Sequence, residues 1–151
     1  MSRWSRGEAS IEQQLRAGEL QSVRGGQADG SPWLVKASRT VGTAAGLVAV
    51  DPSSAITLAY DAARFAAMAV LAQQGLRATT KGGHLAVDDA VRAQFGDAFR
   101  PYRALRIRRN ELEYPEYPDE TVEADEATQA VESARTIIDA AAKLLPHLGL
   151  F

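Results

Sequence analysis

The residues best suited to chemistry lie in one short stretch, residues 105–114, with the sequence LRIRRNELEY. If this stretch is helical, Arg106, Arg109 and Glu113 share the arc on which its apolar residues would be buried, and Asn110 lies at the edge of that arc. Burying an unpaired guanidinium is very unfavourable. These side chains must therefore pair, or face a cleft or a partner. We expect Arg109 and Asn110 to line a solvent-accessible cleft with Tyr114.

Phosphate binding is the chemistry that fits this stretch. The planar fork of an arginine can donate to two phosphate oxygens at once, so Arg109 is a candidate for holding a phosphate that Asn110 would orient. Arg106 and Asn110 are also four residues apart, as are Arg109 and Glu113. Residues at that spacing touch on a helix, so a purely structural or dimer-forming network is the alternative interpretation.

Two residues from other segments are candidates for the same site. Arg64 lies on a polar stripe of an otherwise apolar helix and either pairs with Asp61 at the surface or extends the polar site. His84 follows two glycines and either caps the next helix or lies over the polar site. Tyr114 and Tyr117 flank the end of the arginine-rich helix, where they would stack on bases or serve simply in packing.

Composition narrows the function classes. The 151 residues fit one domain, 1–151, with a sizeable core, and the net charge of −2 argues against strong non-specific DNA binding. The chain has no cysteine and two histidines. Its carboxylates, including the run of Glu111, Glu113, Glu116, Asp119 and Glu120, show no convincing metal spacing, so we predict no metal and no cofactor.

The chain shows no signal-peptide pattern at its N-terminus. Its most apolar segment, residues 62–71, contains Arg64 and is too short to span a bilayer. We therefore expect a cytoplasmic protein that has no membrane contact.

Helical periodicity runs through nearly the whole chain and predicts an all-α, up-and-down bundle of four to five main helices plus a short N-terminal helix. The helices are expected at 11–17, from 31 onward, at 52–75, 85–95 and 98–114, and from 121 onward, with a flexible loop at about 25–31. No strand pattern is visible. The helix at 52–75 is apolar almost all round, so it should be central and bury Ala62, Ala66 and Val70.

The chain also resembles the bacterial HEPN domains, and most closely the uncharacterised actinobacterial branch of that family. The resemblance spans roughly residues 4–148 and is carried by an ordered set of short motifs: YDAAR at 60–64, QGLR at 74–77, GGH at 82–84, RRN at 108–110 and EY at 113–114. It implies a helical bundle that forms a homodimer. Many members of the family are metal-independent ribonucleases, often toxins paired with a minimal nucleotidyltransferase antitoxin. The resemblance thus implies RNA, a nucleotide or such an antitoxin as partner.

The chain departs from the family signature, which is an arginine followed after four to six residues by a histidine. Arg109 and Asn110 match its first half, but Tyr114 stands at the histidine position. A tyrosine is a poor general base near neutral pH because its ordinary pKa is about 10. Arg77 and His84 have a similar spacing, but they lie in a glycine-rich loop outside the signature helix, and we treat this as a chance match.

Three hypotheses follow. The first is a HEPN-like binding and dimerisation module that recognises a nucleotide, RNA or a nucleotidyltransferase-type partner without robust catalysis. The second is an atypical ribonuclease toxin of a toxin–antitoxin or defence system, in which Arg109 and Asn110 bind the scissile phosphate and Tyr114 or His84 transfers the proton. The third is a purely structural helical dimer. The missing histidine favours the first.

Overall fold

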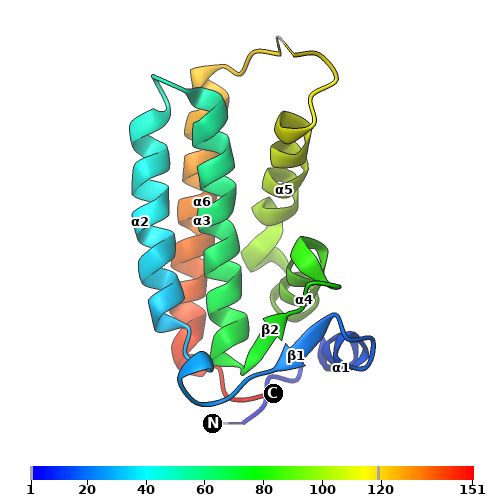
Figure 1. The fold of residues 1–151 in the computed structure, drawn as a ribbon. Helices are drawn as coiled ribbons and strands as arrows, with labels where there is room; N and C mark the ends of the chain where they lie inside the picture. The colour runs from blue at the N-terminus through cyan, green and yellow to red at the C-terminus, as the bar shows by residue number, and fades with distance from the viewer. Residues whose placement is uncertain (1, 119) are drawn as a thin grey trace.

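The computed structural model describes residues 2–118 and 120–151, and it is built almost entirely of helices. The α-helices are α1 (Glu8–Arg16), α2 (Ser31–Leu47), α3 (Pro52–Gln73), α4 (Gly83–Phe95), α5 (Arg100–Glu113) and α6 (Ala124–Leu144). Short 3-10 turns lie at Gly25–Gln27, Gly96–Phe99 and Leu145–His147. Helices α2, α3, α5 and α6 alternate in direction (Figure 1), which confirms the predicted all-α, up-and-down bundle with a short N-terminal helix.

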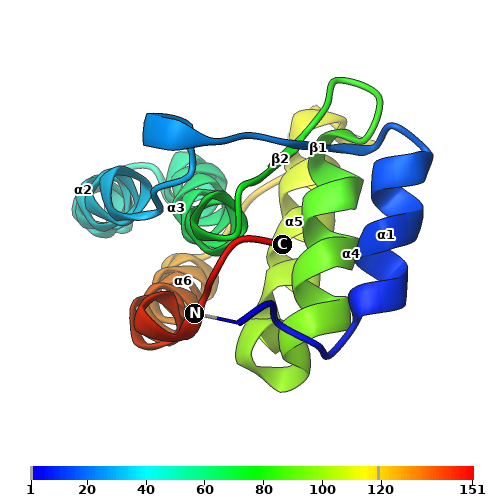
Figure 2. The ribbon, with the colours of Figure 1, turned by 90° about the horizontal axis from the view of Figure 1, so that it is seen from below.

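Helix α3 is the centre of the molecule, as its all-round apolar pattern predicts. It packs against α2, α6 and α5, and Ala62, Ala66 and Val70 are completely buried. The alanines along α3 let neighbouring helices approach its backbone closely. Seen from below, α2, α3 and α6 form one group, while α5, α4 and α1 lie side by side next to it (Figure 2). Helix α3 therefore presents one of its sides to α4 and α5.

Local signals set both ends of α3. Pro52 occupies its first turn, and the carboxylate of Asp51 accepts a hydrogen bond from the backbone N–H of Ser54 at 3.2 Å. At the other end, Gly75 adopts a φ of +69°, which places it in the left-handed region where glycine commonly stops a helix. The predicted end of this helix is thus confirmed to within two residues.

A small antiparallel ribbon corrects the prediction that the chain has no strand. Strand β1 (Leu20–Ser22) pairs with β2 (Leu76–Ala78), with Leu20 opposite Ala78. Each strand is only three residues long, too short for a period of two to be recognised. The two strands are also far apart in the sequence, so no hairpin turn marks them. The ribbon crosses one end of the bundle beside α4 (Figure 1).

Several helix boundaries differ from the predicted ones. Helix α1 begins three residues earlier than expected, α4 begins two residues earlier, and α6 begins three residues later. A 3-10 turn at Gly96–Phe99 precedes α5 and replaces its expected first residues. Part of the expected loop at 25–31 forms a single 3-10 turn at Gly25–Gln27. These differences lie at helix ends, where sequence patterns are least informative.

Helix α3 is apolar over a longer stretch than the predicted segment 62–71. By length and composition alone, its 22 residues could cross a membrane. However, 72% of its most apolar window is buried inside the bundle. Such burial is typical of the core helix of a soluble protein.

Candidate functional site

A buried tyrosine on α3 links residues from three helices into one group. Tyr60 is completely buried, and its hydroxyl lies 2.6 Å from Nδ1 of His84, at the start of α4. The two rings stack with centroids 5.7 Å apart. The Cζ atom of Arg109, on α5, lies 5.8 Å from the centroid of the Tyr60 ring, within cation–π distance. We call Tyr60, Arg64, His84, Arg109 and Glu113 the polar cluster.

Arg109 lies in this cluster with most of its hydrogen-bonding capacity unused. Its Nη2 forms an ion pair with Glu113 at 2.6 Å, which is the expected contact between residues four apart. Its Nη1 makes a long, 3.4 Å hydrogen bond to Asn110 Oδ1, and its Nε is buried without a partner among the described residues. The side chain as a whole is 21% exposed.

Arg64 is bonded in a similarly incomplete way. Its Nη2 lies 3.7 Å from Asp61, so the predicted surface pair forms, although it is long. Its Nη1 donates to the sulfur of Met68, a weak acceptor, and its Nε is buried without a partner. Arg64 thus has donors to spare for an anion, and its side chain is 24% exposed.

The electrostatics of the cluster keep His84 neutral. Burial, followed by the positive charges of Arg64 and Arg109, lowers the pKa of the His84 imidazole, and this outweighs the opposing effect of Asp61 and Glu113. Burial also raises the pKa of the Tyr60 hydroxyl, so this group stays protonated at neutral pH. At neutral pH the cluster therefore holds two guanidinium ions, one of them paired with the Glu113 carboxylate, beside an uncharged imidazole and an uncharged phenol.

Arg106, a predicted site residue, is engaged elsewhere. Its Nε bonds Asp88 Oδ2 on α4 at 3.1 Å, and Nε of Arg103 approaches the same oxygen at 3.3 Å. The Asp88 side chain is completely buried. The structure thus pairs Arg106 with a carboxylate on another helix rather than with Asn110, and this pair fastens α5 to α4.

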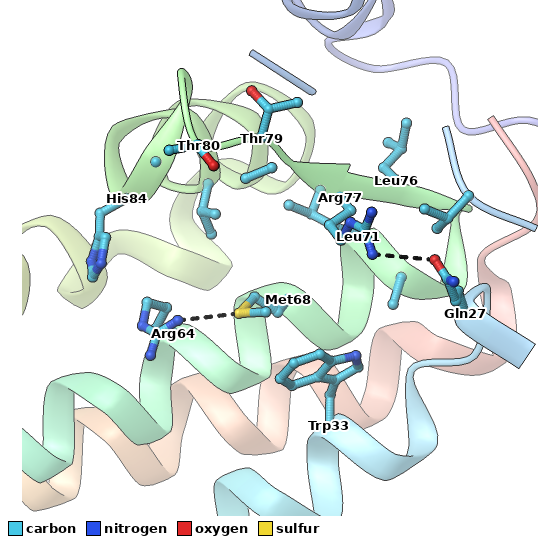
Figure 3. A pocket seen from close by; sticks show the side chains of 15 residues that line it. Gln27, Trp33, Arg64, Met68, Leu71, Leu76, Arg77, Thr79, Thr80 and His84 are labelled. Carbon is cyan, nitrogen blue, oxygen red and sulfur yellow. Dashed lines mark hydrogen bonds between the residues drawn. The ribbon is translucent and has the colours of Figure 1, made fainter. Parts of the chain in front are cut away.

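The cleft expected to contain Arg109, Asn110 and Tyr114 differs from the cavity that the structure shows. Asn110 is exposed, and Tyr114, at the C-terminal end of α5, is 80% exposed. A cavity of about 370 Å³ lies instead between α3, α4 and the ribbon (Figure 3). Two of the predicted residues, Arg64 and His84, line it, as does Arg77, whose spacing to His84 we had treated as a chance match.

The carboxylates near the end of α5 form ion pairs rather than a metal site. Arg108 draws Glu111, Glu120 and Glu126 together, at 3.0, 2.9 and 2.5 Å. Asp119, which belongs to the predicted acidic run, lies outside the described residues. Within residues 2–118 and 120–151, no group of three or more potential metal ligands is found.

Tyr60 and Asp88 make contacts that the sequence did not lead us to predict. Tyr60 looked like one more residue of an apolar helix, and nothing in the spacing indicated that its hydroxyl would meet His84. The burial of Asp88 could have been predicted, because Asp88 shares one helical face with Val91 and Phe95, both of which are buried. A carboxylate on such a face needs a partner, which was the argument applied to the arginines.

Comparisons of the chain with family models, with curated proteins and with solved structures give no match.

Proposed function

We propose that this protein is a HEPN-like binding module whose polar cluster holds the phosphates of single-stranded RNA without cutting the chain. The observation that carries the proposal is the partial exposure of Arg64 and Arg109 together with their incomplete hydrogen bonding. Each side chain is partly exposed, and in the described structure each guanidinium has only one carboxylate partner and a buried Nε without an acceptor. A phosphodiester supplies the acceptors that these guanidinium groups lack.

The hydrogen bond between Tyr60 and His84 supports binding over cleavage. The Tyr60 hydroxyl is protonated at neutral pH and lies 2.6 Å from His84 Nδ1, with the hydroxyl of Tyr102 as its other neighbour. We propose that it donates to Nδ1, which would place the proton of the neutral imidazole on Nε2. An Nε2–H group donates a hydrogen bond to an anion well. It cannot accept a proton there, so it is a poor general base.

Tyr114 gives the second argument against efficient cleavage. It occupies the position of the family's histidine, and it is largely exposed at the end of α5 rather than held against Arg109. Losing a positioned general acid or base typically lowers a rate by about 10² to 10⁴. A ribonuclease with this site would be slow at best.

Binding of a fluorescein-labelled single-stranded RNA, followed by fluorescence anisotropy, tests the proposal. We expect micromolar affinity that weakens as salt is added, because phosphate contacts release counterions. Arg109→Gln should weaken binding about tenfold. Arg135→Gln, which alters an exposed arginine on α6, is the matched control and should have little effect. Equal effects of the two substitutions, or no binding by the wild type, would refute the proposal.

An atypical ribonuclease is the second candidate, and one observation favours it. His84 is a neutral imidazole whose pKa is lowered by burial and then by two nearby arginines, a combination that metal-independent RNA cleavage could use. The same RNA, incubated with and without divalent metal and run on a denaturing gel, separates the two candidates. We expect weak or no cleavage. Robust cleavage that is lost in both Arg109→Ala and His84→Gln would establish the second candidate.

Tyr114→His extends the same assay. If this substitution creates or strongly raises cleavage, the cluster is a ribonuclease site that lacks its acid/base group. The proposal also includes a homodimer in the cytoplasm and a nucleotidyltransferase-type protein as a further partner, the last of which rests on the family resemblance alone. A protein that binds neither RNA nor nucleotide would be the purely structural dimer.

A further inference from the structure

The cavity beside the polar cluster has the properties of a small-molecule site. Its volume of about 370 Å³ falls within the range of roughly 300 to 1,000 Å³ that is usual for such sites. Its walls come from α2, α3, α4 and the ribbon, so the cavity lies where four separate elements meet (Figure 3). The RNA proposal gives this cavity no role.

The inner walls of the cavity are mostly apolar. Trp33 on α2 faces it together with Met68 and Leu71 on α3, and Leu76 and Val87 also line it (Figure 3). The indole of Trp33 lies beside the ring of Phe65, at a centroid distance of 6.0 Å. An indole with a thioether and aliphatic side chains around it favours a flat apolar body.

The rim of the cavity carries positive charge. Arg77 projects from β2, where its Nη1 donates to Gln27 Oε1 at 3.2 Å, and its Nε and Nη2 donate to the correctly oriented amide oxygen of Gln21 at 2.9 and 2.5 Å. Both partners are uncharged, and among the residues that the structure describes no carboxylate forms an ion pair with Arg77. No carboxylate occurs in the described lining either. Arg64 adds a second positive charge, from the end of the cavity next to His84 (Figure 3). A ligand with one anionic group would neutralise the charge of Arg77, for which the described residues supply no ion pair.

We propose that this cavity binds a small molecule with a flat apolar body and a single carboxylate or phosphate group, the body lying against Trp33 and Met68 and the anionic group bonded to Arg77. The Nη1 and Nη2 atoms of Arg77 each keep a second N–H group that can donate to either anion. The inference does not depend on RNA binding, because the anionic group is assigned to Arg77, which lies outside the polar cluster, although Arg64 and His84 belong to both sites.

Isothermal titration calorimetry with matched probes tests this inference on the full chain. The probes are 2-naphthoate and 1-naphthyl phosphate as the two anionic forms, 2-naphthol as the neutral form, and inorganic phosphate as the anion without a body. We expect at least one naphthyl anion to bind with a ratio of one to one and micromolar affinity. The affinity of the neutral probe should be at least about tenfold lower than that of the anion, and inorganic phosphate should show no binding below about 1 mM. The stronger of the two anions identifies the head group.

Two variants and a control complete the test. Arg77→Gln changes an exposed side chain, so the fold should persist, and affinity for the anion should fall about tenfold while affinity for the neutral probe stays the same. Trp33→Leu should weaken both classes of probe. Arg135→Gln on α6 should change neither. The proposal is overturned if no naphthyl anion binds up to about 1 mM, if 2-naphthol binds as tightly as the anions, or if Arg77→Gln has no effect.

Discussion

At the scale of single residues, identity and environment together decide what a side chain can do. Arg106 and Arg109 are three residues apart on the same helix, yet one meets a completely buried carboxylate and the other meets a tyrosine face and a half-exposed glutamate. Arg106 therefore stabilises the packing of α5 against α4. Arg109 keeps donors for a ligand.

Arg106→Ala should destabilise the fold. Among the described residues, the substitution leaves the buried Asp88 carboxylate with Arg103 alone, whose side chain is 41% exposed, so a buried charge loses its better partner. We expect the free energy of unfolding to fall by about 3 kcal/mol, as when one member of a buried ion pair is removed. Urea unfolding followed by circular dichroism measures this. Arg100→Ala, which breaks a highly exposed pair with Asp97, is the control and should cost less than about 1 kcal/mol. Similar losses in the two variants would contradict this account.

His84 should titrate below its ordinary pKa of 6.5, because burial and the charges of Arg64 and Arg109 disfavour the imidazolium. Above pH 6.5 the imidazole is neutral in both folded and unfolded chains and contributes nothing to pH dependence. As the pH falls from 6.5 towards the lowered folded pKa, the unfolded chain binds the proton first, so stability should decrease over that window.

Proton–nitrogen NMR of the imidazole measures both the titration of His84 and its tautomer. We expect the proton on Nε2 at neutral pH, and we expect Arg64→Gln to raise the pKa of His84 towards its ordinary value. A pKa above 6.5, or a proton on Nδ1, would remove the argument that His84 serves as a donor to an anion.

At the scale of helices and strands, the periodicity of apolar residues was enough to predict the bundle and its central helix. The pattern of α3 alone implied that Ala62, Ala66 and Val70 are buried, and they are. The ribbon could not be predicted, because its register depends on pairing between two three-residue segments that only the finished fold brings together. For the same reason, only part of the site could be predicted. The Arg109–Glu113 pair lies within one helix, whereas Tyr60–His84 and Asp88–Arg106 join different helices.

Gly75→Ala tests how the ribbon is joined to α3. Gly75 has a φ of +69°, and a Cβ added there would lie 2.8 Å from the backbone oxygen of Val23, beside β1. The left-handed conformation alone costs a residue with a side chain about 1 to 2 kcal/mol, and the close approach adds to that. We expect a loss of at least about 2 kcal/mol in thermal or urea unfolding. Gly42→Ala, on the exposed side of α2 with nothing near the added Cβ, is the control and should be neutral or stabilising.

At the scale of the whole molecule, the expected homodimer is the main prediction. Large apolar side chains are exposed on the two helices that flank the polar cluster, namely Leu85 on α4 and Ile107 on α5, with Tyr114 at the end of α5. In a twofold interface each such residue is used twice. Light scattering at micromolar concentration should give twice the chain mass of 16.2 kDa, and Ile107→Asp should shift the mass towards a monomer. A monomer mass for the wild type would count against the dimer.

Chemical-shift mapping by NMR tests most directly whether the polar cluster binds RNA. A short single-stranded RNA is titrated into the isotope-labelled protein, and the amide and side-chain signals are followed. The account predicts that the largest shifts fall around Tyr60 and Arg64 on α3, at His84, and from Arg109 to the end of α5, and that they saturate in the micromolar range. Shifts confined to α2, α6 or the N-terminal helix, or no saturable shift at all, would contradict the central claim.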